Sequence, residues 1–65
     1  MEEPMKPIER AQAVLILLSD EVRPISLEKI MKELKFTKSQ TLAALKRLDN
    51  YIIIENGKFK LLKDL

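Results

Sequence analysis

The pair Asn56-Gly57 constrains the fold of this chain more than any other feature of its sequence. Residues 51–55 before it are aromatic or β-branched up to a final glutamate, and residues 58–62 after it carry three apolar side chains and two lysines. Asn-Gly between two such segments predicts a β-hairpin, because both residues of the two-residue turn need positive φ angles. The turn fixes the register, so the predicted cross-strand pairs are Glu55 with Lys58, Ile54 with Phe59, and Ile52 with Leu61.

The pleat of this hairpin divides its side chains between two faces. The two apolar pairs share one face, and we expect them to complete the core. The other face would carry Tyr51, Ile53, Lys60 and Leu62. Upstream, residues 22–25 are predicted to form a short connector or a minimal edge strand, because Pro24 cannot continue a helix.

A first helix is predicted over residues 7–20, because Pro7 suits a first helical turn and apolar residues follow at helical spacing. The residues of this inward stripe are Ile8, Ala11, Leu15 and Leu18. Val14, Ile16 and Leu17 fall elsewhere on the helix, so its apolar surface exceeds one stripe. In so small a domain, we expect the additional face to contact a partner chain.

Two further helices are predicted from their capping residues. Ser26 is a typical N-cap for a second helix over residues 27–34. Thr37 and Gln40 form a capping-box pattern, which predicts the start of a third helix over residues 38–49. The helical period then predicts the inward residues of this third helix, which are Thr41, Ala44, Leu45 and Leu48.

The chain has 65 residues, with no cysteine and no histidine. Its core is therefore small, and neither disulfides nor the preferred zinc ligands can stabilise it. The common nucleophile–base pairs are missing too, so we expect no enzymatic activity, no metal, no cofactor and no small-molecule ligand. The longest apolar run, residues 13–18, is too short to span a bilayer, which predicts a soluble cytoplasmic protein without membrane contact.

About three residues, 35–37, join the second and third helices, as is typical of a helix-turn-helix. The segments Ile-Ser-Leu-Glu-Lys-Ile at 25–30 and Leu-Lys-Phe-Thr-Lys-Ser-Gln-Thr-Leu-Ala-Ala-Leu-Lys-Arg-Leu at 34–48 resemble the core of winged helix-turn-helix domains. The resemblance is to the DNA-binding domains of small archaeal and bacterial transcriptional regulators, and it covers about residues 8–62.

This resemblance implies an α+β fold in which three helices are followed by a two-stranded β-hairpin wing. We expect one domain over residues 7–65, preceded by a disordered N-terminal arm of residues 1–6. Many family members have a glycine between the recognition helix and the wing. In this chain, Asn50 is the residue expected to adopt the left-handed conformation there.

The charges are distributed unevenly along the chain. Residues 1–34 carry five cations and seven anions, whereas residues 35–65 carry seven cations and three anions. The positive excess therefore falls on the third helix and the hairpin, the elements that the resemblance would place against nucleic acid. Phosphate contacts need such a surface, because they supply most of the non-specific affinity for DNA.

These observations predict binding of double-stranded DNA in transcription regulation, with the third helix in the major groove. Ser39, Gln40 and Ala43 would face the base edges, where Gln40 can pair with adenine. The phosphates would be contacted by the cations Lys38, Lys46, Arg47, Lys58 and Lys60, with Thr37 or Ser39 as a neutral contact. A solvated helix face is the simpler reading of the same residues, and Gln40 can serve as a capping residue instead.

A homodimer is predicted from apolar residues beyond the expected core. The expected interface residues are Val14, Ile16 and Leu17 of the first helix and Tyr51, Ile53 and Leu62 of the hairpin. The alternative function is that of a protein-interaction module in a larger assembly, because winged-helix domains also serve as docking pieces.

Overall fold

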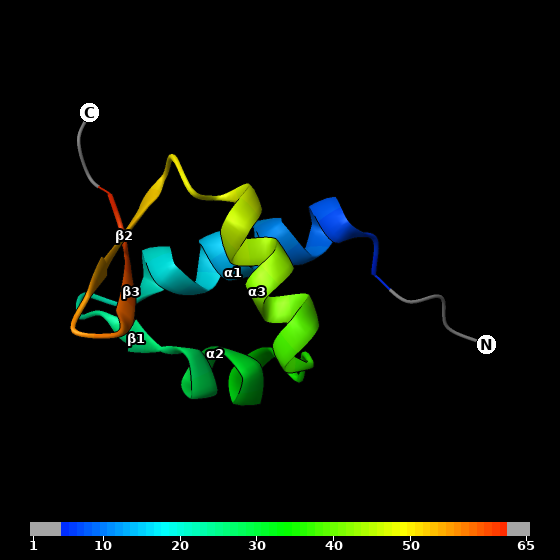
Figure 1. The fold of residues 1–65 in the computed structure, drawn as a ribbon, viewed down its shortest axis with the longest axis horizontal. Helices are drawn as coiled ribbons and strands as arrows, with labels where there is room; N and C mark the ends of the chain where they lie inside the picture. The colour runs from blue at the N-terminus through cyan, green and yellow to red at the C-terminus, as the bar shows by residue number, and fades with distance from the viewer. Residues whose placement is uncertain (1–4, 63–65) are drawn as a thin grey trace.

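Each helix begins where its capping residues predict. In the computed structural model, which describes residues 5–62, helix α1 spans Pro7–Asp20, α2 spans Leu27–Leu34 and α3 spans Lys38–Arg47 (Figure 1). The Glu9 carboxylate accepts a hydrogen bond from the Lys6 N–H at 3.0 Å, and the Ser26 hydroxyl accepts one from the Lys29 N–H at 3.2 Å. Residues 1–4 of the predicted arm lie outside the described residues.

Helix α3 is shorter than predicted, and the chain leaves it without a left-handed residue. The N–H groups of Leu48 and Asp49 bond to carbonyls three residues back, at 3.0 and 3.2 Å, and the Tyr51 N–H bonds to the Leu48 carbonyl at 2.7 Å. These bonds tighten the last turn, so the expectation for Asn50 was wrong. The left-handed residue next to a helix is instead Lys35, which ends α2 with φ 58°.

The sheet has three antiparallel strands, so the expected two-stranded hairpin was incomplete. Strands β2 (Ile52–Glu55) and β3 (Lys58–Leu61) have the predicted register, and Asn56 and Gly57 have φ angles of 52° and 77°. Strand β1 (Ile25–Ser26) adds to the other side of β3, with Ile25 opposite Phe59, which gives the order β1-β3-β2. Of the predicted segment 22–25, only Ile25 belongs to this edge strand, which continues to Ser26, and residues 22–24 form the connector before it.

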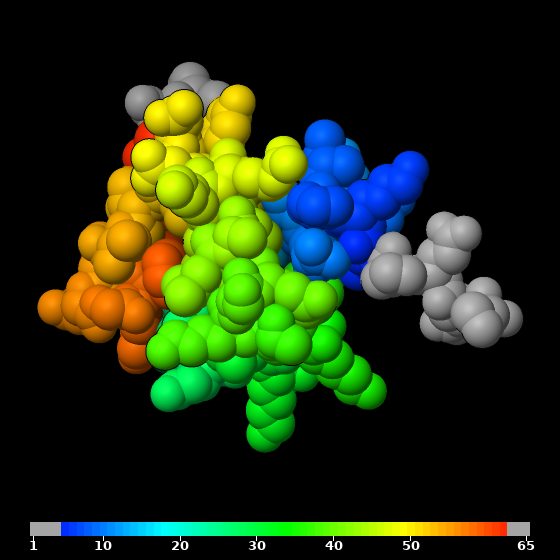
Figure 2. Space-filling model, turned by 45° about the vertical axis from the view of Figure 1, so that its right-hand side comes forward, coloured from blue at the N-terminus to red at the C-terminus, as the bar shows by residue number. Residues whose placement is uncertain are grey.

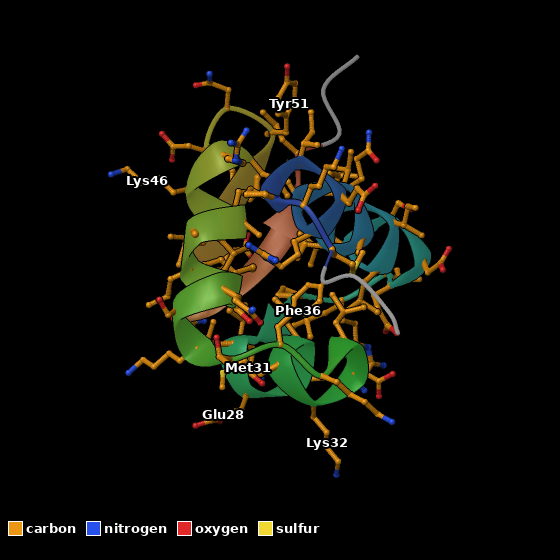
Figure 3. All side chains as sticks on the ribbon, turned by 90° about the vertical axis from the view of Figure 1, so that its right-hand side faces the viewer. Glu28, Met31, Lys32, Phe36, Lys46 and Tyr51 are labelled. Atoms are coloured by element: carbon orange, nitrogen blue, oxygen red, sulfur yellow. The ribbon has the colours of Figure 1, made fainter. Side chains whose placement is uncertain are left out.

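The core lies where α1 crosses between α3 and the sheet (Figure 1). Its buried side chains come from all three helices, from β1 and from the residue that caps α3: Ala11, Val14, Leu18, Ile25, Ile30, Ala44, Leu45 and Leu48, with the Thr41 side chain also buried. The four predicted inward residues of α3 are therefore all confirmed. Leu27, Leu34 and Phe36 pack around this cluster, and Figure 3 shows Phe36 between the helices.

The inward stripe of α1 differs from the predicted one. Val14 is fully buried and belongs to the core, so its assignment to a dimer interface was wrong. Ile8, predicted to face inward, is 55% exposed. The stripe that meets α3 and the sheet is Ala11, Val14 and Leu18, with Leu15 and Leu17 partly buried beside it.

One residue of the hairpin core face also differs from its prediction. Ile52, Phe59 and Leu61 pack against the core, but Ile54 is 65% exposed. Ile54 lies next to the turn, at the end of the hairpin farthest from the C-terminal end of α3 (Figure 1). The pair Ile54–Phe59 therefore covers the core through Phe59 alone.

Candidate nucleic-acid interface

The outward side of α3 is a surface of small, polar and cationic side chains. Figure 2 shows α3 in front, with the hairpin on one side and the N-terminal half of α1 on the other. The helical period turns Thr41, Ala44 and Leu45 into the core and leaves the opposite side free. The residues exposed there are Lys38, Ser39, Ala43, Lys46 and Arg47, with Thr37 at the N-cap and Gln40 half-buried.

The charges on this helix are all positive. Helix α3 contains Lys38, Lys46 and Arg47 and no acidic residue, and it has no acid in its first turn. By contrast, the first turns of α1 and α2 carry Glu9 and Glu28. An acid in the first turn would offset the positive end of the helix dipole, so the N-terminal end of α3 keeps its full attraction for anions.

A capping box positions the start of α3. The Thr37 hydroxyl accepts from the Gln40 N–H, and the Gln40 Oε1 accepts from the Thr37 N–H, both at 3.1 Å. The buried Thr41 hydroxyl donates to the Thr37 carbonyl at 2.8 Å, which fastens the same turn to the core. This bond holds the Gln40 side chain against the Thr37 backbone, and its amide N–H groups and the second lone pair of Oε1 stay free for a further partner.

The two C-terminal cations of α3 lie beside different neighbours. Lys46 extends from the outer side of α3, as Figure 3 shows, at the rim of a groove that faces the hairpin. Arg47 lies on the opposite flank, at an apolar groove that it lines with Ile8, Ala11, Gln12, Leu15, Leu48 and Tyr51. The two cations at the C-terminal end of α3 therefore lie on opposite sides of the helix, Lys46 towards the hairpin and Arg47 towards α1.

The two lysines of the hairpin are not equivalent. Lys58 is exposed beside the turn, opposite Glu55. Lys60 is half-buried near the C-terminal end of α1, beside Leu18, Ser19 and Glu21. The structure thus brings the predicted residues of α3 together on one surface, but it holds Lys60 against another part of the molecule.

Sequence reasoning missed an apolar groove between α3 and the hairpin. It is lined by Leu42, Leu45, Lys46, Asp49, Ile52, Ile54 and Phe59. Leu42 and Ile54 are 45% and 65% exposed. The signal in the sequence was the excess of apolar residues on the hairpin, where Ile52, Ile53 and Ile54 are consecutive.

The remaining residues of the predicted dimer interface differ in exposure. Ile16, Tyr51 and Leu62 are exposed, at 61%, 59% and 42%. Ile53 and Leu17 are half-buried, and Leu17 packs against the core. For these five residues, a role in a dimer stays a prediction.

Within residues 5–62, no cluster of three or more acidic side chains has the arrangement of a metal site. No helix in the same part of the chain is long and apolar enough to cross a membrane. Comparisons of the chain with protein-family models, with curated proteins and with solved structures found no match.

Proposed function

We propose that this chain is a winged helix-turn-helix domain that binds double-stranded DNA as a small transcriptional regulator. The observation that carries the proposal is the outward surface of α3, which combines small polar side chains with three cations and no acid. An α-helix with its side chains is about 10–12 Å across, so α3 is of a size that enters the major groove, which is about 12 Å wide.

The residues of α3 divide into two groups under this proposal. Ser39, in the first turn of α3, and Ala43, near its middle, would face the base edges, where the Ala43 methyl group can contact thymine. Lys38, Lys46 and Arg47 lie towards the two ends and would contact phosphates on either side of the groove. Thr37 would give a neutral backbone contact at the N-cap.

Gln40 fits a positioning role better than base reading. The bond from the Thr37 N–H holds its amide back at the N-cap, whereas a bidentate contact with adenine needs the amide to extend towards the base. In the capping box, Gln40 fixes the first turn of α3 and so helps to set the angle at which α3 would enter the major groove of DNA. Lys58 at the hairpin turn would contact the backbone nearby, and Lys60 contributes less because it is half-buried beside Glu21.

The test reverses two charges on α3. We expect the double variant Lys46→Glu/Arg47→Glu to lose binding to duplex DNA at moderate salt, because two phosphate contacts become repulsive. The control Lys6→Glu/Arg23→Glu makes the same change in net charge at exposed positions outside α3. Fluorescence anisotropy with a random duplex at several salt concentrations measures both variants, and circular dichroism checks that each is folded.

The dependence on salt adds a second measure. For each phosphate contact removed, the slope of log K against log salt should fall by about one. A single variant, Lys46→Glu, should therefore bind more weakly and with a shallower slope than the parent. Equal affinity of the Lys46→Glu/Arg47→Glu chain and the control would refute the placement of α3 on DNA.

The alternative is a protein-interaction module, and the apolar groove between α3 and the hairpin favours it. The exposure of Leu42 and Ile54 in this groove would suit an apolar partner rather than phosphates. Binding of that kind would change little with salt, because it depends on buried apolar surface. The salt titration therefore separates the two functions.

A further inference from the structure

Strand β2 forms one edge of the sheet, and half of its backbone groups have no partner in the described chain. The order β1-β3-β2 leaves one side of β2 free. Antiparallel residues alternate between pairs that exchange hydrogen bonds and pairs that do not. The two-residue turn makes Glu55–Lys58 a bonded pair, which makes Ile53–Lys60 the next, and the Leu62 N–H bonds to the Tyr51 carbonyl at 2.8 Å. The N–H and C=O groups of Ile52 and Ile54 therefore point away from β3.

This edge lacks the features that usually prevent strand pairing. Exposed edges are normally protected by lysine, proline, a bulge or a covering segment. Strand β2 has three consecutive isoleucines and only one charge, on Glu55. Ile54 of this strand is 65% exposed, and Tyr51, which precedes the strand, is 59% exposed.

The opposite edge of the sheet is different. Strand β1 has only two residues, follows Pro24, which has no N–H, and leads directly into α2. A second molecule that paired with β1 would find almost no free backbone groups. Pairing between copies is therefore restricted to β2 on both sides, which favours a closed two-fold arrangement over an open chain of molecules.

We propose that β2 pairs antiparallel with β2 of a second copy of this chain, about a two-fold axis at Ile53, to form a continuous six-stranded sheet. Ile53 then lies opposite Ile53 of the second copy. Ile52 lies opposite Ile54 of the second copy, and these two residues exchange backbone hydrogen bonds. The same exchange occurs on the other side of the axis, so every outward N–H and C=O of Ile52 and Ile54 gains a partner.

The side chains are complementary to the same arrangement. Ile52 and Ile54 share the sheet face of the apolar groove, so pairing would place the exposed Ile54 against Ile52 of the second copy. At each end of the paired strands, Tyr51 of one copy lies opposite Glu55 of the other, so no two like charges are opposed. The strand thus complements itself in hydrogen bonds and apolar surface, with no like charges opposed, which identifies a second copy as its occupant. This inference does not depend on DNA binding.

The test places charges at the two-fold axis. Ile53→Glu puts two carboxylates directly opposite each other between copies, while within each chain the new side chain faces Lys60 across the hairpin. We expect a dissociation constant of the dimer at least about tenfold higher than that of the parent. Ile53→Lys should weaken the dimer in the same way, and an equimolar mixture of the two variants should form a heterodimer.

Sedimentation equilibrium measures the association of each chain. The parent should shift from its monomer mass of 7.6 kDa to about 15 kDa as the concentration rises. The control is Ile8→Glu, which charges the apolar groove between α1 and α3 at a residue that is 55% exposed. This control should keep the dimer. Dissociation by Ile8→Glu but not by Ile53→Glu would assign the dimer to that groove and overturn the proposal.

Hydrogen exchange locates the contact without any substitution. The amides of Ile52 and Ile54 should gain protection as the parent chain is concentrated, because they bond only between copies. Those of Ile53 and Glu55 should be protected at every concentration, because they bond to β3. A parent chain that stays monomeric at millimolar concentration, or a dimer in which Ile52 and Ile54 exchange freely, would contradict the proposal.

Discussion

The residue Lys35 has a backbone conformation that is unfavourable for its type. It ends α2 with φ 58° and ψ 42°, where a side chain with a Cβ costs about 1–2 kcal/mol. We expect Lys35→Gly to raise the free energy of unfolding by about 0.5 kcal/mol, because the relief of strain exceeds the entropy that glycine adds to the unfolded chain. Urea denaturation measures the change.

The matched control for this prediction is Lys32→Gly. Lys32 is also exposed, lies three residues earlier and has a helical backbone within α2, as Figure 3 shows. There, glycine should lower the free energy of unfolding by about 1 kcal/mol. Equal effects of the two substitutions would mean that Lys35 is not left-handed in solution.

At the scale of elements, local patterns in the sequence predicted most of the helices and the hairpin. The caps at Ser26 and Thr37 depend on residues three positions away, and the Asn56-Gly57 turn fixes its own register, so each is encoded within a few residues. The outward surface of α3 was predictable for the same reason, because its buried residues follow a single helical stripe.

Helix α1 could not be predicted as well, because it is apolar on several sides. Its residues 13–18 are all apolar, so several stripes fit the helical period equally. The choice of Val14 over Ile8 depends on where α3 and the sheet pack, and no local signal contains that information. The half-burial of Lys60 beside α1 depends on the same packing.

A pair of substitutions in α1 tests which stripe is buried. Val14 is fully buried and Ile16 is 61% exposed. Val14→Ala should lower the free energy of unfolding by about 2 kcal/mol, because it removes apolar contacts and leaves a cavity. Ile16→Ala should change it by less than about 0.5 kcal/mol. The comparison is made by urea denaturation of dilute protein, where association does not contribute.

The small core and the unprotected sheet edge have a common consequence. The buried core consists of eight apolar side chains, and the chain has no cysteine with which to form a disulfide. A domain of this size is marginally stable alone, so association of two copies would add a substantial share of its stability. In the proposed dimer, this added stability would come from the pairing of β2 with β2 of the second copy.

Association of two copies would make the thermal stability of the chain depend on its concentration. If the native chain is dimeric, each tenfold rise in concentration adds about 0.7 kcal/mol per chain, half of the 1.4 kcal/mol that corresponds to a factor of ten. For a domain of this length, that change raises Tm by about 3–6 °C. Differential scanning calorimetry over two decades of concentration measures the shift.

The Ile53→Glu chain is the control for the same measurement. Its Tm should not change with concentration, because its two-fold contact is opposed by charge, and at low concentration its Tm should match that of the dilute parent. The cross-strand partner Lys60 keeps the new carboxylate compatible with the hairpin, so any loss of stability at high concentration belongs to the contact between copies. If the Tm of the parent did not depend on concentration, the chain would fold as a monomer, and the proposed pairing of β2 would be refuted.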